Sequence, residues 1–410
     1  MDRTRWKLLA AGLAGMLLLA GCDVDAGDDP NRSPAGPTDT PSPTIAPGAE
    51  TPAAELRAAI GAGIQSHVYL LGVGTATLIR EGSDSPGFVQ TQATIDDNTA
   101  ALAEIVASAF GEEAAGRFTD LWTAQVGYVN DYARGYAEGD EALRTQMAQE
   151  LDTFRVDIGT LFDELTDGVV PAETGTAQIE PMFDGELEVV DAQVAGGDVT
   201  GELRETVGDA PPLADLLAGA IIVHEPDRYR DSVEAPSSIL RSTMQALWQE
   251  HTFLTWYAVD AGLRSGFGSS AFASARASLD ANTAAMAERW GEDYGADSAR
   301  AFERAWQSEV DAMLAYAEGS GTALDDLEVF RASLAQIVQE ETRLVIDQET
   351  FEAELVAHTE TTTEAIDARR NDTRLQWDEL LGAASQMPVL ADIVATATIQ
   401  RFPDVYGPEG

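Results

Sequence analysis

An internal repeat constrains the fold of this 410-residue chain more than any other feature. Residues 56–133 pair with residues 240–317 at a constant offset of 184 positions, without a gap. The phrase NTAALAE, which begins at Asn98, returns as NTAAMAE, which begins at Asn282. A unit of about 175 residues is therefore duplicated in tandem, and each copy is large enough to bury a core of its own.

Each copy is predicted to be helical. Between Leu56 and Leu78, apolar or small residues recur every three or four positions, which is typical of an amphipathic helix. Pro226 and Pro403 are expected to end the last helix of each copy, because proline cannot continue the hydrogen-bond ladder. The fold class is therefore all-α, with two tandem homologous up-and-down helical bundles. In the first copy we expect helices at about 54–81, 92–109, 112–137, 140–166, 180–195 and 200–224.

The beginning of the chain is predicted to be an export signal. Arg3, Arg5 and Lys7 precede a short apolar stretch, which ends in the phrase LAGC at Cys22. This phrase resembles the lipobox of bacterial lipoproteins. The resemblance implies cleavage before Cys22 and lipidation of its thiol, and hence a membrane anchor. An ordinary secretory signal is the alternative.

After the signal, the amino-acid composition distinguishes a linker from the two helical bundles. Pro, Thr, Asp and Gly dominate the segment after Cys22, which is typical of a disordered tether. The predicted domains are a lipoprotein signal peptide (1–21), the lipidated Cys with its linker (22–52), and two helical bundles (53–231 and 236–410). No segment after the signal is expected to span a membrane. We therefore expect the bundles at the extracytoplasmic face of a bacterial cell membrane.

The charge balance excludes one class of partner. The formal net charge is −45, from 70 acidic residues against 25 Lys and Arg. Such a surface repels nucleic acid, so nucleic-acid binding is not expected. An envelope protein, a small molecule or a cation remains as a partner. Cys22 is the single cysteine, so no disulfide is expected in the bundles.

The helical period directs several polar side chains toward the inside of each bundle. His67 and His251 fall on the buried stripe of the first helix of their copies, and Asn98 and Asn282 fall on that of the second helix. The inward set of the second copy comprises His251, Asn282, Glu309 and His358. The corresponding set of the first copy comprises His67, Asn98, Trp122 and Gln125.

The two sets differ at two positions. Gln125 stands where the second copy has Glu309, and Val190 stands opposite His358. The first copy is therefore expected to lack both a carboxylate and a histidine. One interpretation of both sets is a hydrogen-bond network that fixes the register of the bundle, since buried polar groups need partners. The other is a ligand or metal pocket in the second copy. Two histidines and a carboxylate could bind one divalent transition metal.

The second copy resembles a group of uncharacterised bacterial exported helical-bundle proteins. The resemblance is carried by LRSTMQALWQEHTFLT, with the pattern Leu-Arg…Leu-Trp-x-x-His, and by IQRFP, with the pattern Ile-x-x-Phe-Pro. It implies that His251 and His358 recur in that group, and it implies no particular activity.

The sequence motifs favour a non-enzymatic protein. A nucleophile elbow, a phosphate loop, a Rossmann fingerprint and a Cys–His pair are all missing. We expect a lipid-anchored envelope protein that binds a ligand or metal, or holds a partner. One alternative is a metal-dependent enzyme built on His251, Glu309 and His358. Another is a purely structural spacer in the envelope.

Overall fold

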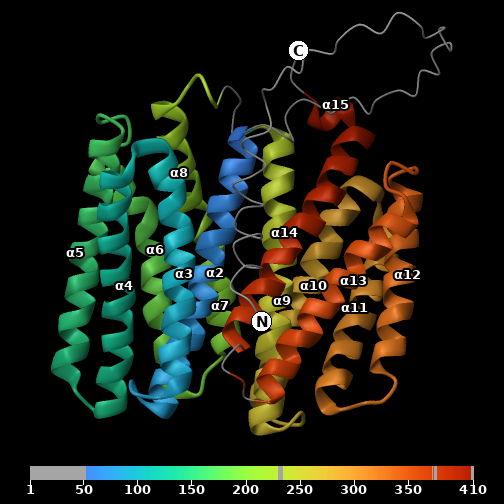
Figure 1. Ribbon diagram of the computed structural model, residues 1–410, viewed down its shortest axis with the longest axis horizontal. Coiled ribbons are helices and arrows are strands. Elements are labelled where there is room, and N and C mark those ends of the chain that lie inside the picture. Colours follow the sequence, from blue (N-terminus) through green and yellow to red (C-terminus); the bar gives the residue numbers. More distant parts are fainter. Residues whose placement is uncertain (1–51, 230–233, 372, 374–375, 408–410) are drawn as a thin grey trace, which may run out of the picture. The chain divides into compact units, whose positions relative to one another are not determined.

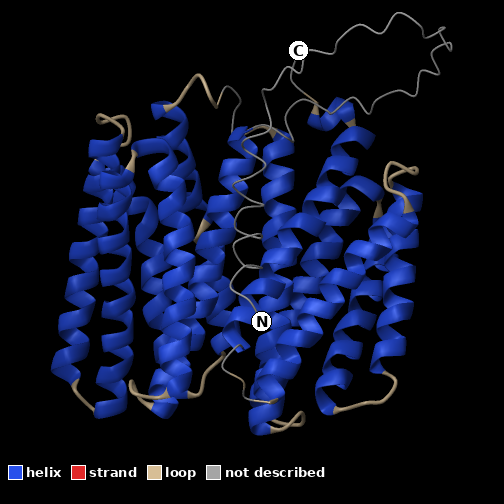
Figure 2. Ribbon diagram, in the orientation of Figure 1, coloured by secondary structure: helices blue, strands red, loops and turns tan. Residues whose placement is uncertain are grey.

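The computed structural model describes residues 52–229, 234–371, 373 and 376–407. All regular elements in these ranges are helices, which confirms the all-α prediction (Figure 2). The described residues belong to one compact unit, Pro47–Gly410, which contains both predicted bundles. The signal peptide, Cys22 and nearly all of the predicted tether lie outside the described residues.

The helices of the two halves correspond in order (Figure 1). The first half contains α2 (Pro52–Glu81), α3 (Pro86–Phe110), α4 (Glu112–Glu138), α5 (Glu141–Leu165), α6 (Ala172–Ala195), α7 (Val199–Gly208) and α8 (Pro211–His224). The second half contains α9 (Pro236–Ser265), α10 (Ser270–Tyr294), α11 (Ala296–Glu318), α12 (Ala323–Glu341), α13 (Gln348–Arg370), α14 (Gln376–Arg401) and α15 (Pro403–Tyr406). The first three helices of each half begin 184 positions apart, which is the offset of the sequence repeat. The duplication itself stays an inference from the sequence.

The same local signals delimit equivalent helices. Ser85 and Ser269 are the N-caps of α3 and α10, and each side chain accepts a hydrogen bond from the backbone N–H three residues later. Gly111 and Gly295 end these helices with φ angles of 85° and 87°, a conformation that favours glycine. Because of the Ser85 cap, α3 begins at Pro86, six residues before the predicted start.

Two further boundaries differ from the prediction. Helix α6 begins at Ala172 and not at residue 180, and it accommodates Pro181 in its interior. The last long helix is interrupted in the first half, between Gly208 and Pro211, but is continuous through Pro388 in α14. As predicted, α8 ends just before Pro226 and α14 ends just before Pro403.

Helices α2 and α9 lie side by side in the middle of the unit, with α3, α4 and α6 packed against α2, and α10, α11 and α13 packed against α9; α5 and α12 lie farther out (Figure 1). Several contacts join these two central helices. Gln65 donates to the carbonyl of Ala246 (3.0 Å), and the Tyr257 hydroxyl donates to the carbonyl of Tyr69 (3.0 Å). The Tyr69 ring stacks on Phe253 at a centroid distance of 4.8 Å. The halves therefore share a packed interface.

Two stretches are long and apolar enough to cross a membrane by length and composition, Val199–His224 and Gln376–Arg401. The prediction that no such segment follows the signal was therefore wrong in this respect. In each, half or slightly more of the most apolar window is buried inside the protein (50% and 56%). In this packing both stretches belong to the core of the protein. Buried core helices can meet the same criteria of length and hydropathy as membrane-spanning helices.

Candidate functional site

In the second half, three of the predicted inward residues form one cluster. His251 of α9 lies 2.9 Å from Glu309 of α11, between Nε2 and Oε2. His358 of α13 approaches the other carboxylate oxygen of Glu309 at 3.6 Å. All three side chains are fully buried. The prediction that they point inward from different helices is therefore confirmed.

The two histidines control the charge of the carboxylate. Burial by itself would raise the pKa of Glu309, because an ionised group loses its hydration. The charges and hydrogen bonds of His251 and His358 outweigh this effect and lower the pKa to about 2. Glu309 is therefore ionised at neutral pH inside the bundle.

The geometry of this cluster is that of a hydrogen-bond network. Both Nε2 atoms approach Glu309 itself, and His358 Nδ1 lies 3.4 Å from the Thr362 hydroxyl. The Trp306 ring packs against His251 at 4.9 Å. In the described residues, no group of three or more His, Cys, Asp or Glu side chains could hold a metal ion. Of the two contacts to Glu309, the one from His251 is a hydrogen bond, and the one from His358 at 3.6 Å is longer than a hydrogen bond.

Asn282 belongs to a different network. Its amide donates to the carbonyl of Leu247 (3.0 Å) and to Glu250 (2.6 Å). The other oxygen of Glu250 accepts from Tyr69 of α2 (3.1 Å) and from Arg204 of α7 (3.2 Å). Asn282 therefore supports the interface between the halves. The sequence analysis missed Glu250, which no repeat signal marks because its counterpart is Ser66.

The repeated asparagine has a structural role common to both halves. Asn98 donates to the carbonyl of Gly63 (3.1 Å), and Asn282 makes the equivalent bond to Leu247. Each carbonyl lies one helical turn before the buried histidine, His67 or His251. The asparagine thus ties the second helix of each half to the first and sets their register.

The first half contains a carboxylate that the sequence analysis did not predict. Glu186 of α6 is 3% exposed and lies 3.4 Å from His67 Nε2. Gln125 donates to its other oxygen, and Trp122 donates to His67 Nδ1 at 3.0 Å. The expectation that this half lacks a buried carboxylate was therefore wrong, because α6 supplies one in place of α4.

The position of Glu186 explains the error. It precedes Val190 by one helical turn, so both residues lie on the inward face of α6. Val190, which the sequence alignment places opposite His358, is fully buried. Burial raises the pKa of Glu186, and the opposing effects of His67, Arg155 and Gln125 are too weak to reverse the shift.

A cavity of about 450 Å³ opens between the two halves, and the sequence analysis did not predict it. Helices α2, α3, α9, α13 and α14 contribute to its walls. Three arginines line it, Arg80, Arg264 and Arg369, together with the aromatic side chains of Trp256 and Trp377. One signal was present in the sequence, because Arg80 and Arg264 occupy equivalent positions of the repeat.

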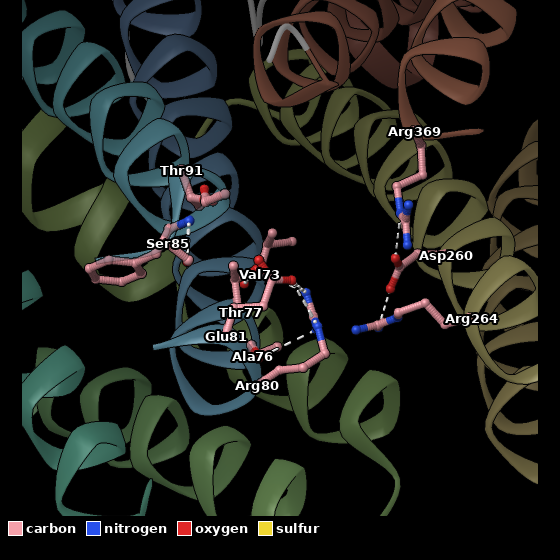
Figure 3. A network of polar contacts seen from close by, with 12 residues as sticks. Val73, Ala76, Thr77, Arg80, Glu81, Ser85, Thr91, Asp260, Arg264 and Arg369 are labelled. Atoms are coloured by element: carbon pink, nitrogen blue, oxygen red, sulfur yellow. Dashed lines mark hydrogen bonds and ion pairs between the residues drawn. The ribbon is translucent and has the colours of Figure 1, made fainter. Parts of the chain in front are cut away.

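An acidic residue holds two of these arginines in place (Figure 3). Asp260 accepts from Arg369 at 2.7 Å and also from Arg264. Arg80 instead bonds its neighbour Glu81 at 2.7 Å. Burial lowers the pKa of Arg264, and the charges of Arg80 and Arg369 lower it further against the opposing effect of Asp260. The cavity therefore concentrates positive charge.

A scan of known protein families and searches of curated proteins and of solved structures found no match to this chain.

Proposed function

We propose that the protein is a non-enzymatic binding protein, held by a lipid on Cys22 at the extracytoplasmic face of a bacterial membrane, and that it takes a small molecule into the cavity between its halves. The cavity carries this proposal. Its volume of about 450 Å³ is in the usual range of small-molecule sites, about 300–1,000 Å³. Such sites commonly lie where two compact parts of a protein meet.

The walls of the cavity also fit this role. Ligand sites combine apolar and aromatic surface with a few fixed polar groups. Here Trp256 and Trp377 provide the aromatic surface, and their ring centroids are 5.1 Å apart. Arg369 and Asp260 form an ion pair in which both side chains are largely buried, 17% and 6% exposed. A site with such fixed groups needs little rearrangement to bind.

Thermal unfolding tests the proposal. The mature chain from residue 22, with Cys22→Ser to prevent lipidation, would be heated with a panel of anionic, neutral and cationic small molecules. A ligand that binds the folded state raises the Tm, and the rise grows with concentration. Ala76→Trp, at a half-buried position in the cavity wall, should remove the shift. Ala148→Trp, at a half-buried position on α5, is the matched control.

A purely structural spacer predicts a different result. No compound would then change the Tm, and the two tryptophan variants would give the same response to every compound. That outcome would refute the binding function. The anchor is tested separately by labelling cells with a radioactive fatty acid, which should be incorporated into the natural protein and not into Cys22→Ser.

The metal-dependent alternative rests on His251, Glu309 and His358. It has less support, because the three side chains are fully buried and contact one another directly. Elemental analysis after separate exposure to Zn, Cu, Mn and Fe tests it. About one metal per chain, lost in both His251→Ala and His358→Ala, would favour this alternative over the core network.

A further inference from the structure

We infer that the ligand is a flat organic anion, with a carboxylate that binds between Arg80 and Arg264 and an aromatic ring that packs on Trp256 and Trp377. This inference rests on the proposed function and names the class of ligand. It is carried by the charge, the geometry and the aromatic wall of the cavity.

The charge of the cavity is opposite to that of the protein. The chain has 25 Lys and Arg against 70 acidic residues, yet three arginines line this one cavity. The carboxylates in its lining are those of Glu81 and Asp260, so the formal charge of the lining is positive. Salt screens distant surface charges beyond about 10 Å, so the local arginines decide which ligands are attracted. They favour an anion and disfavour a cation.

The two arginines of the repeat face each other across the open space. Figure 3 shows the side chains of Arg80 and Arg264 directed toward one another from α2 and α9. Asp260 is the one hydrogen-bond acceptor of Arg264 in the described part of the chain, so most N–H donors of that guanidinium are available. The side chains of Arg80 and Arg264 are 39% and 35% exposed, whereas Asp260 is nearly enclosed.

A carboxylate fits this arrangement. Guanidinium groups bind carboxylates through two parallel N–H···O bonds in one plane. Arg80 pairs with Glu81 and Arg264 pairs with Asp260, and no acidic side chain bridges the two guanidinium groups in the described structure, so a ligand carboxylate can take the place between them. Asp260 pairs with Arg264 and Arg369 and makes no hydrogen bond to Arg80 in the described structure.

The aromatic wall of the cavity favours an aromatic ring at the end of the ligand away from its carboxylate. Trp256 and Trp377 are 4% and 3% exposed, and both line the cavity. The indole N–H of Trp377 donates to the carbonyl of Gly87 (3.3 Å), which fixes this ring across the interface. The indole N–H of Trp256 is buried and has no acceptor among the described residues. The two rings therefore form a fixed apolar part of the cavity wall.

Four matched probes test the class of ligand. Phenylacetate carries the ring and the carboxylate, phenylacetamide is its neutral counterpart, phenethylamine is a cation with the same ring, and acetate lacks the ring. Binding to the Cys22→Ser mature chain would be followed by the fluorescence of its tryptophans and by calorimetry. We expect phenylacetate to bind at least about 10-fold more tightly than each of the other three.

Variants locate the binding site. Arg80→Met and Arg264→Met should each weaken phenylacetate about 10- to 100-fold, because a charge-assisted hydrogen bond is lost. Arg117→Met is the matched control and should leave binding unchanged, since Arg117 pairs with Glu164 on the surface of the first half, outside the cavity. Circular dichroism of each variant checks that the helices remain intact.

The outcomes separate the two proposals. Equal or tighter binding of phenylacetamide, phenethylamine or acetate would overturn the aromatic carboxylate as ligand and leave the binding function standing. Unchanged phenylacetate affinity in both Arg80→Met and Arg264→Met would also overturn it. If no small molecule of any charge binds, and Ala76→Trp behaves as the natural chain does, the binding function fails as well.

Discussion

Glu186 in the first half and Glu309 in the second are both enclosed carboxylates beside the histidine of the leading helix, yet their pKa values move in opposite directions. Burial disfavours the ionised form of each. Glu309 has two histidine partners, the nearer at 2.9 Å, and its pKa falls to about 2. Glu186 has one histidine at 3.4 Å and a neutral amide, and its pKa rises.

This difference shows what determines the charge of a buried acid in this fold. Depth of burial is nearly the same for both groups, so it cannot distinguish them. The number and distance of the cationic or hydrogen-bonding partners decide the outcome. The surroundings in the second half therefore favour the ionised carboxylate, and those in the first half favour the neutral acid. The four experiments below test this contrast, in order of decreasing effect.

Removing each carboxylate should give the largest difference. Glu309→Gln takes away one member of a buried, charged cluster, and we expect a loss of about 3 kcal/mol or more in the free energy of unfolding. Glu186→Gln should cost only about 1 kcal/mol, because its amide can keep a hydrogen bond and burial already disfavours the ionised form of the acid. Denaturant unfolding of both variants measures the two values. Equal losses would show that the two centres are energetically alike.

The dependence of stability on pH should also differ in sign. The pKa of Glu309 is lowered from 4.5 to about 2, so its contribution is complete above 4.5 and is lost as the pH falls toward 2. The loss is about 3 kcal/mol. The pKa of Glu186 is raised, so its contribution is present below 4.5 and is lost as the pH rises through the raised value.

Unfolding free energies between pH 2.5 and pH 7 check these signs. The variant Glu309→Gln should decline less steeply than the natural chain below about pH 4.5. The variant Glu186→Gln should lose less stability than the natural chain as the pH rises above that value. Parallel curves for all three proteins would contradict the assignment of the two charge states.

The sequence was sufficient for the fold and for part of the buried centre. Helical periodicity identified His67, His251 and His358 as inward residues, because an amphipathic stripe specifies which face of a helix is buried. It missed Glu186, because the comparison with the second copy looked for a carboxylate only on α4, whereas this one lies on α6. The sequence analysis also placed Asn282 in one set with the histidines, although it belongs to a different network. One face of a helix can contact two different neighbouring helices, and periodicity does not tell which residue contacts which.

The cavity between the halves could not be predicted by the same reasoning. Periodicity within one helix carries no information on how two bundles meet. The walls combine Arg80 of α2 with Trp256 of α9 and Arg369 of α13, which come together only through that packing. The repeat did indicate that Arg80 and Arg264 are equivalent, but an arginine near a helix end is usually explained by the helix dipole.

Replacing the two repeated asparagines, Asn98 and Asn282, should give a moderate difference in the free energy of unfolding. Asn98→Ala removes the bond to Gly63 and should cost about 1 kcal/mol. Asn282→Ala removes the equivalent bond and also leaves Glu250 without its donor at 2.6 Å, so we expect about 2–3 kcal/mol. Thermal or denaturant unfolding compares the two. A larger loss for Asn98→Ala would mean that the interface network around Glu250 adds no stability.

The smallest expected difference concerns the arginines at the start of the two central helices. Arg57 pairs with Asp215 at 2.6 Å, and its repeat counterpart Arg241 pairs with Asp392 at 2.5 Å. The acid is 44% exposed in the first pair and 30% exposed in the second, and water screens the more exposed pair better. We therefore expect Arg241→Met to cost more than Arg57→Met, by less than about 1 kcal/mol. If denaturant unfolding gives equal losses, the halves are energetically alike at this end of the interface.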